Sequence, residues 1–236
     1  MDLVYVVGGD TPDDRSDLRH SLRSMAANLR IDIRDVWVVG DVPAWFTGAK
    51  MPLEPKPAKF ENQRASIEAY VNHPGADDSF VLLNDDMFCL EPTEVIEPIR
   101  NKAMSDTWNA DHPVTHSPDC WTCAVRETAA WASERAGGPV HLYENHTPLI
   151  FDTLRLRDLV NEYPRDRRFV VGELFALAGI GGTGRVAGNA KVKAHDRLDA
   201  KLALDMPWIS GNPDSWAGAL GDLIRETFPD PSPWEG

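Results

Sequence analysis

The chain has 236 residues, 42% of them hydrophobic, and a formal net charge of -13. This length suits one α/β domain, and the negative charge argues against electrostatic binding to nucleic acid or anionic lipid. No stretch approaches the roughly 20 apolar residues of a membrane span. The first apolar run has the length of a strand, so we expect a cytoplasmic protein without a signal peptide. The sequence does not indicate an oligomeric state.

The first forty residues predict a β-α-β unit. Residues 3–7 and 36–39 are short apolar runs with the composition of strands. Between them, residues 11–14 supply helix-capping side chains, and Leu18, Leu22, Met25 and Leu29 recur at helical spacing. Such a unit is typical of a parallel sheet. Residues 42–60 are predicted to form a long loop, and residues 60–71 a helix.

An apolar run that ends in acidic residues is the most informative segment. Residues 80–83 are apolar, and Asn84, Asp85 and Asp86 follow directly, which predicts a buried strand ending in two carboxylates. Open α/β folds bind ligands at this edge of the sheet. Two adjacent carboxylates repel each other unless a cation or a proton lies between them. Mg²⁺ binds one or two carboxylates together with phosphate oxygens. An acidic turn without a ligand is the alternative interpretation.

The second half of the chain is less regular. Helices are predicted at 121–136, 153–163, 173–178 and 215–228, and strands at 140–143, 149–151 and 207–210. His146 follows the first of these strands. Because the ends of parallel strands share one edge, we expect His146 in the same pocket as Asp85 and Asp86. The whole chain, 1–236, is expected to form a single α/β domain with a mainly parallel central sheet.

Two cysteines and two histidines have the spacing of metal ligands. His112, His116, Cys120 and Cys123 place four donors within twelve residues, which would suffice for a tetrahedral zinc site. No second CxxC accompanies the first, and an odd cysteine count does not indicate a disulfide framework. We therefore favour two ordinary cysteines that form no redox pair and leave zinc as the alternative.

Four separated segments resemble one family, in the same order along the chain. The first comprises residues 18–24, 36–40 and 42–45, and the second runs from Phe60-Glu-Asn62 to Asn84-Asp85-Asp86. The third is His146-Thr-Pro148, and the last comprises residues 210–214 and 228–235. These segments resemble the Stealth proteins, which transfer sugar-1-phosphate groups, and most of all the short Stealth-related glycosyltransferases of actinobacteriophages. The turn Gly8-Gly9-Asp10 departs from the tryptophan-containing turn of the family, and Gln63 replaces its usual serine.

The resemblance implies a GT-A-like domain. Residues 1–90 would form its nucleotide-binding half, and residues 91–236 its acceptor side and C-terminal helix. Asp85 and Asp86 would bind Mn²⁺ or Mg²⁺. The residues implied in binding the nucleotide-diphosphate sugar are Asp10, Arg19, Asn62 and Asn84.

Three further residues are implied in catalysis. His146 would act as a general base or a phosphate contact, Arg168 would stabilise phosphate charge, and Asp214 would be a second carboxylate for metal or acceptor. Four of the implied site residues also have a structural interpretation: Asp10 as a turn residue, Arg19 as a solvated helix residue, and Asn62 and Asp214 as helix N-caps.

The leading function is a metal-dependent glycosyltransferase that moves a sugar to a glycan or protein hydroxyl. It would work in the cytoplasm, or in the host cytoplasm if it is phage-encoded. A Stealth-type sugar-1-phosphate transferase is the alternative, and a non-catalytic sugar- or nucleotide-binding module is the second alternative. Neither the sugar, the base nor the acceptor can be predicted from the sequence.

Overall fold

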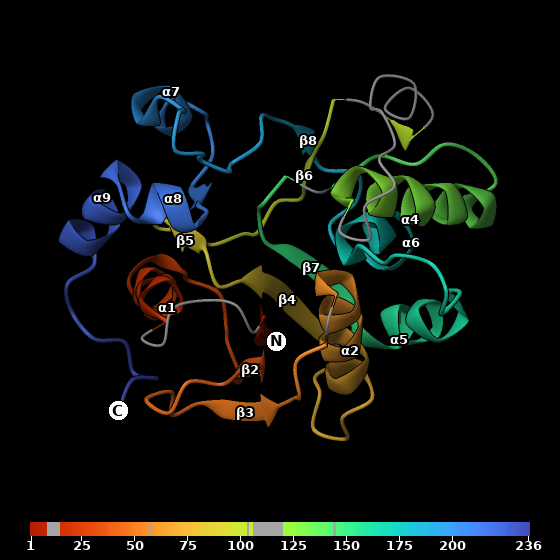
Figure 1. Cartoon of the computed structure of the whole chain (residues 1–236), viewed down its shortest axis with the longest axis horizontal. Coiled ribbons are helices and arrows are strands. Elements are labelled where there is room, and N and C mark those ends of the chain that lie inside the picture. The colour runs from red at the N-terminus through yellow and green to blue at the C-terminus, as the bar shows by residue number, and fades with distance from the viewer. Residues whose placement is uncertain (9–14, 57, 103, 106–119, 144) are drawn as a thin grey trace.

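A computed structural model describes residues 1–8, 15–56, 58–102, 104–105, 120–143 and 145–236. Its centre is a five-stranded sheet in the order β3-β2-β1-β4-β7 (Figure 1). The strands are β1 (Asp2–Val7), β2 (Val36–Gly40), β3 (Ala49–Pro52), β4 (Ser79–Asn84) and β7 (Leu149–Asp152). The first four are parallel, and β7 is antiparallel to β4. The prediction of an α/β fold with a mainly parallel central sheet is therefore confirmed.

Helices cover both faces of the sheet, so its strands are apolar on both sides. The helix α1 (Ser16–Asn28) packs on one face, where Leu18 and Leu22 contact a core that contains Leu3. The other face carries α2 (Lys59–Val71), α5 (Thr153–Glu162) and α6 (Phe175–Ala178) (Figure 1). Because successive strand residues point to opposite faces, Val4 belongs to this second core.

Smaller elements flank the central sheet. The strand β5 (Met87–Cys89) pairs with β9 (Trp208–Ser210), and β6 (Ile99–Arg100) pairs with β8 (Arg185–Val186). The remaining helices are α4 (Trp121–Ala136), the 3₁₀ helix η1 (Val171–Leu174), α7 (Leu198–Leu202), α8 (Pro213–Trp216) and α9 (Ala219–Thr227). None of the described helices is long and apolar enough to cross a membrane.

Three predicted elements differ from the structure. Residues 140–143 form no strand, and His141 makes only an isolated bridge to Met104. The predicted helix at 215–228 is divided into α8 and α9, because the backbone leaves helical geometry at Gly218. The predicted loop at 42–60 contains β3, a short edge strand whose side chains are half-buried or exposed.

The antiparallel strand β7 begins at the edge of the sheet where β4 ends, and this determines which residues share that edge. Leu149, at the start of β7, pairs with Leu82, near the end of β4. The chain entering β7 therefore lies beside the chain leaving β4, although more than sixty residues separate Leu82 from Leu149 in the sequence. The parallel strand β1 ends at the same edge.

Candidate functional site

A cleft of about 790 Å³ opens at this edge of the sheet. Its floor includes Val6 and Gly8 at the end of β1, Asn84 and Asp85 at the end of β4, and His146 before β7. One wall is formed by the start of α2 and the segment before it, and another by residues between 189 and 201. Its volume is within the range of pockets that bind small molecules and cofactors, about 300–1,000 Å³.

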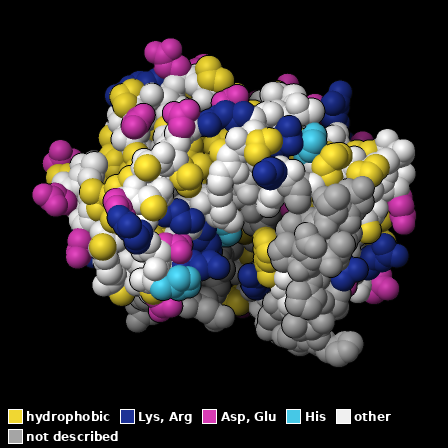
Figure 2. All heavy atoms as spheres, turned by 90° about the horizontal axis from the view of Figure 1, so that it is seen from above, with side chains coloured by type: hydrophobic (Ala, Val, Ile, Leu, Met, Phe, Trp, Pro, Cys, Tyr) yellow, Lys and Arg dark blue, Asp and Glu magenta, His cyan; other side chains and the backbone are white. Residues whose placement is uncertain are grey.

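The cleft is basic although the chain as a whole is acidic. Five of the seven lysines of the chain line it: Lys56, Lys59, Lys191, Lys193 and Lys201. Figure 2 shows Lys and Arg side chains, with His beside them, gathered around a hollow near the middle of the face that is drawn. Like charges that line a cleft focus the electric field and attract ligands of opposite charge. The cleft therefore suits an anionic ligand.

Asp85 and Asp86 form the turn between β4 and β5. Oδ2 of Asp85 lies 3.6 Å from Nη1 of Arg15, and Oδ2 of Asp86 lies 3.8 Å from Nζ of Lys191. Burial, together with the charge of Asp86, raises the pKa of Asp85 to about 8. Burial also raises the pKa of Asp86. At neutral pH, the pair therefore favours a bound proton or cation over two free negative charges.

The surroundings of the two carboxylates fit a hard divalent cation. Both residues border a smaller cavity of about 70 Å³, together with Asp17 and Asn212, and Asp85 borders the main cleft as well. Oδ1 of Asp86 is buried and accepts no hydrogen bond from the described residues. Within the described ranges, no three His, Cys, Asp or Glu side chains form a complete metal site. A cation bound here would need further ligands from water or from a bound phosphate, as Mg²⁺ commonly does.

His146 reaches the cleft in a rarely occupied backbone conformation. Its φ is 55°, in the left-handed region that few residues other than glycine adopt. Burial and the positive charges of Lys191, Lys59, Lys201 and Lys193 lower the pKa of His146 to about 3. Nδ1 of His146 is buried and has no hydrogen-bond partner among the residues that the structure describes. The imidazole is therefore neutral at pH 7, and His146 is one of the residues that line the cleft.

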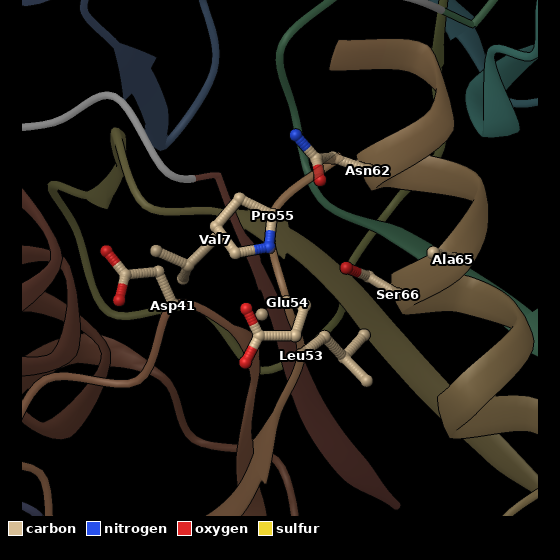
Figure 3. A pocket seen from close by; sticks show the side chains of 9 residues that line it. Val7, Asp41, Leu53, Glu54, Pro55, Asn62, Ala65 and Ser66 are labelled. Carbon is tan, nitrogen blue, oxygen red and sulfur yellow. The ribbon is translucent and has the colours of Figure 1, made fainter. Parts of the chain in front are cut away.

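Asn62 holds the chain segment that carries Lys56. Its side-chain amide donates to the carbonyl of Lys56 at 3.0 Å and accepts a hydrogen bond from the Lys56 N–H. Asn62 is not the N-cap of α2, a position that Ala58 occupies. Asn62 also borders a pocket of about 10 Å³, where it and Ser66 on α2 face Pro55 and Glu54 (Figure 3). This pocket has room for about one water molecule, so it is not a separate ligand site.

Arg19 does not face the cleft. Its Nη1 lies 3.2 Å from Oε2 of Glu235, and its guanidinium stacks over Trp45 at 4.2 Å. Glu235 is almost fully buried, and Arg23 also binds it, at 2.8 Å. A buried carboxylate needs a cationic partner, which explains why both arginines turn toward the C-terminal segment.

Arg168 and Asp214 were also predicted to lie in the site, but neither is among the described residues that line the cleft. Nη2 of Arg168 lies 2.9 Å from Oε1 of Glu127 on α4, and the same carboxylate accepts a hydrogen bond from the Arg168 backbone N–H at 2.8 Å. Asp214 is exposed on α8. The N-cap of α8 is Asn212, which forms a capping box with Ser215. Asp10 lies outside the described residues.

Two groups of residues at this site were not predicted from the sequence. Arg15 is 3% exposed and contacts the carboxylates of both Asp41 and Asp85. It is the one basic residue in the acidic stretch 10–17, which was a usable signal. The lysines gave a second signal, because five of seven fall within residues 56–59 and 191–201.

Cys120 and Cys123 are joined by a disulfide at the start of α4. The prediction of two ordinary cysteines is therefore wrong. In this bonded state neither sulfur is the thiolate that a zinc ion requires, and His112 and His116 lie outside the described residues. The adjacent Trp121 lines the cleft, so the disulfide lies beside the cleft wall.

Comparison with models of known protein families and with curated proteins finds no match to this chain. The likeness to Stealth-type transferases is therefore carried by its four motif segments alone.

Proposed function

We propose that the chain is a metal-dependent glycosyltransferase of GT-A-like fold that uses a nucleotide-diphosphate sugar as donor. One observation carries the proposal: Asn84, Asp85 and His146 share a single cleft with five lysines, at the sheet edge where open α/β folds bind ligands. The lysines suit anionic groups of the substrates, the carboxylates suit Mn²⁺ or Mg²⁺, and the neutral imidazole suits a general base.

Asp85 and Asp86 would hold the divalent cation. When bound, it supplies Lewis-acid stabilisation of the departing diphosphate. Asp85 carries a proton at neutral pH because its pKa is raised to about 8, so binding of the cation must release that proton. Lys191 lies beside Asp86 in the protein alone, and Arg15 would offset the charge of Asp85 once its proton is lost.

His146 would accept the proton of the acceptor hydroxyl. With its pKa lowered to about 3 it is neutral but a weak base, because general bases work best with a pKa near the working pH. The positive charges of four lysines contribute to this lowering. An anionic group of a substrate that binds between those lysines would offset their charge and raise the pKa of His146. Binding of such a substrate would therefore make His146 a stronger base.

Nucleotide release tests the proposal and separates its alternatives. Purified protein is incubated with UDP- and GDP-sugars and a mixture of glycan acceptors, with Mn²⁺, with Mg²⁺ or with EDTA. We expect a nucleoside diphosphate to be released only with metal. Release of a nucleoside monophosphate would indicate sugar-1-phosphate transfer, which the lysine-rich cleft also suits. Binding of the donor without release of any nucleotide would contradict the enzyme and favour a binding module.

A further inference from the structure

Three lysines of the cleft have no carboxylate partner among the described residues. Lys191 is paired with Asp86 at 3.8 Å, and Lys201 with Asp196 at 3.6 Å. The other three, Lys56, Lys59 and Lys193, form no ion pair within the part of the chain that the structure describes. Asp85, the remaining acidic residue of the lining, already lies beside Arg15. The cleft therefore keeps a positive charge after its internal pairs are formed.

These three lysines come from two separate segments of the cleft lining. Lys56 and Lys59 come from the start of α2 and the segment before it, whereas Lys193 comes from the wall that also carries Lys191 and Lys201. Lys59 and Lys193 both lower the pKa of His146, so charges from the two walls act at one point. Like charges that converge raise the free energy of the folded state unless an anion lies between them.

A metal-bound donor does not supply enough negative charge. A nucleotide-diphosphate sugar carries about two negative charges, and one divalent cation bound through its phosphates offsets them. The complex of donor and cation is then close to neutral. The three unpaired lysines are left for the second substrate of the cleft.

We propose that the acceptor itself carries a phosphate group, which Lys59 and Lys193 bind beside His146. This inference rests on the proposed glycosyltransferase function. The ammonium of lysine is a compact charge with three donors, and it is a common binder of phosphate. The phosphate places a hydroxyl of the same molecule next to the imidazole and defines which acceptors are used.

The reaction leaves this phosphate unchanged. The bond between the anomeric carbon and the diphosphate oxygen breaks, and the nucleoside diphosphate leaves with the electron pair. A new bond forms between the anomeric carbon and the acceptor oxygen. The proton of the acceptor hydroxyl passes to His146.

Calorimetric titration of the protein preloaded with UDP or GDP and Mg²⁺ tests the inference. The probes are inorganic phosphate, glucose 6-phosphate, glucose and glucuronic acid. We expect glucose 6-phosphate to bind about tenfold more tightly than glucose, the gain that one charge-assisted hydrogen bond supplies. Inorganic phosphate should compete with it. Lys193→Gln and Lys59→Gln should each remove most of the gain, whereas Lys50→Gln, an exposed lysine of β3 outside the cleft lining, should not.

Each other outcome overturns a different statement. Equal affinity for glucose 6-phosphate and glucose, or unchanged affinity in Lys193→Gln, overturns the phosphate-bearing acceptor while nucleotide binding remains. Glucuronic acid that binds as tightly as glucose 6-phosphate shows that a carboxylate suffices and overturns the choice of phosphate. If the protein binds no nucleoside diphosphate with Mg²⁺ before any probe is added, the proposed function fails, and this inference fails with it.

Discussion

Asp85 would determine how the proposed metal site responds to pH. Its folded pKa, about 8, is above the ordinary value of 3.8 because of burial and the neighbouring Asp86. The proton is therefore bound in the folded protein and lost from the unfolded chain between these two values. Without metal, the contribution of Asp85 to the stability is present below the ordinary pKa and is lost as the pH rises through the folded pKa.

The same shift makes metal binding dependent on pH. Because the cation must displace the proton of Asp85, we expect the affinity for Mn²⁺ to rise from about pH 6 to about pH 8.5, with release of a proton. Calorimetry in buffers of different ionisation enthalpy measures both effects. Asp85→Asn, which has no proton to lose at this position, should bind Mn²⁺ more weakly and with a smaller dependence on pH. A pH-independent affinity in the unaltered protein would count against this role of Asp85.

His146 is expected to control turnover rather than donor binding. Removal of a general base lowers the rate by about 10²–10⁴-fold. We expect His146→Ala to show this loss of kcat with little change in nucleotide affinity. His146→Asn is the matched control, because asparagine tolerates the left-handed backbone found at φ 55°. If His146→Asn kept the turnover of the unaltered protein, the backbone conformation would matter and the imidazole would not.

The sequence located the principal polar residues of the cleft but not the partners of the arginines. Asn84 and Asp85 line the cleft because a buried strand ends there, as the apolar pattern predicts. His146 was also placed near Asp85, but for a wrong reason: it precedes the antiparallel β7 and does not follow a parallel strand. The pairing of Arg19 with Glu235, 216 residues away, could not be predicted, because no local pattern encodes it.

The C-terminal segment is an element that stabilises α1. Glu235 accepts hydrogen bonds from Arg19 and Arg23 on α1, and the backbone of Trp234 accepts one from Thr47. Hydrogen bonds from Arg23 and from Ser232 lower the pKa of Glu235 to about 2, against the effect of burial. Because the folded pKa lies below the ordinary value of 4.5, the stability that Glu235 contributes is present above pH 4.5 and is lost as the pH falls toward 2.

Loss of this carboxylate should destabilise the fold without affecting the cleft. We expect Glu235→Ala to lower the free energy of unfolding by about 1–3 kcal/mol, the effect of leaving charged donors without a partner. Glu235→Gln, which keeps the shape and one acceptor, should lose less. Urea denaturation at pH 7 and at about pH 3 measures the difference, which should shrink at the lower pH. If Glu235→Ala lowered the free energy of unfolding equally at both pH values, the role of the Glu235 charge would be contradicted.

The disulfide at the start of α4 is expected to be dispensable for activity. It closes a loop with a sequence separation of only three, so it constrains the unfolded chain little. Cys120 is also the N-cap of α4, a position that serine fills well. The double variant Cys120→Ser and Cys123→Ser should therefore retain nucleotide release. Loss of nucleotide release from a variant that stays folded would show that the disulfide positions Trp121 in the cleft wall.

Long periodic elements were predictable, and so were the short apolar strands β7 and β9, whereas β3 and β5 were not. The predicted helix at 121–136 coincides with α4, and the strand ending at Asn84 with β4. The strand β3 has no apolar run, since its side chains are half-buried or exposed, and β5 has only three residues directly after the acidic turn. The last predicted helix is divided at Gly218, where the backbone leaves helical geometry, and periodicity does not reveal such a break.

At the scale of the molecule, an acidic chain surrounds a basic cleft. The formal net charge is -13, yet five of seven lysines line one cavity. The negative exterior disfavours non-specific contact with other polyanions, while the cleft attracts a small anion. Since salt screens exposed charges over about 8 Å at physiological ionic strength, the affinity of the cleft for a small anion such as inorganic phosphate should fall as salt is added.

The most direct test of the metal-assisted donor site is calorimetric titration of UDP and GDP with Mn²⁺ and with EDTA. We expect the unaltered protein to bind one nucleoside diphosphate with metal and at least about tenfold more weakly without it. Asp86→Ala should abolish the difference between Mn²⁺ and EDTA while the melting temperature in EDTA stays close to that of the unaltered protein. Equal affinities with Mn²⁺ and EDTA in the unaltered protein, or an Asp86→Ala variant that keeps the full effect of the metal, would contradict the assignment of this cleft.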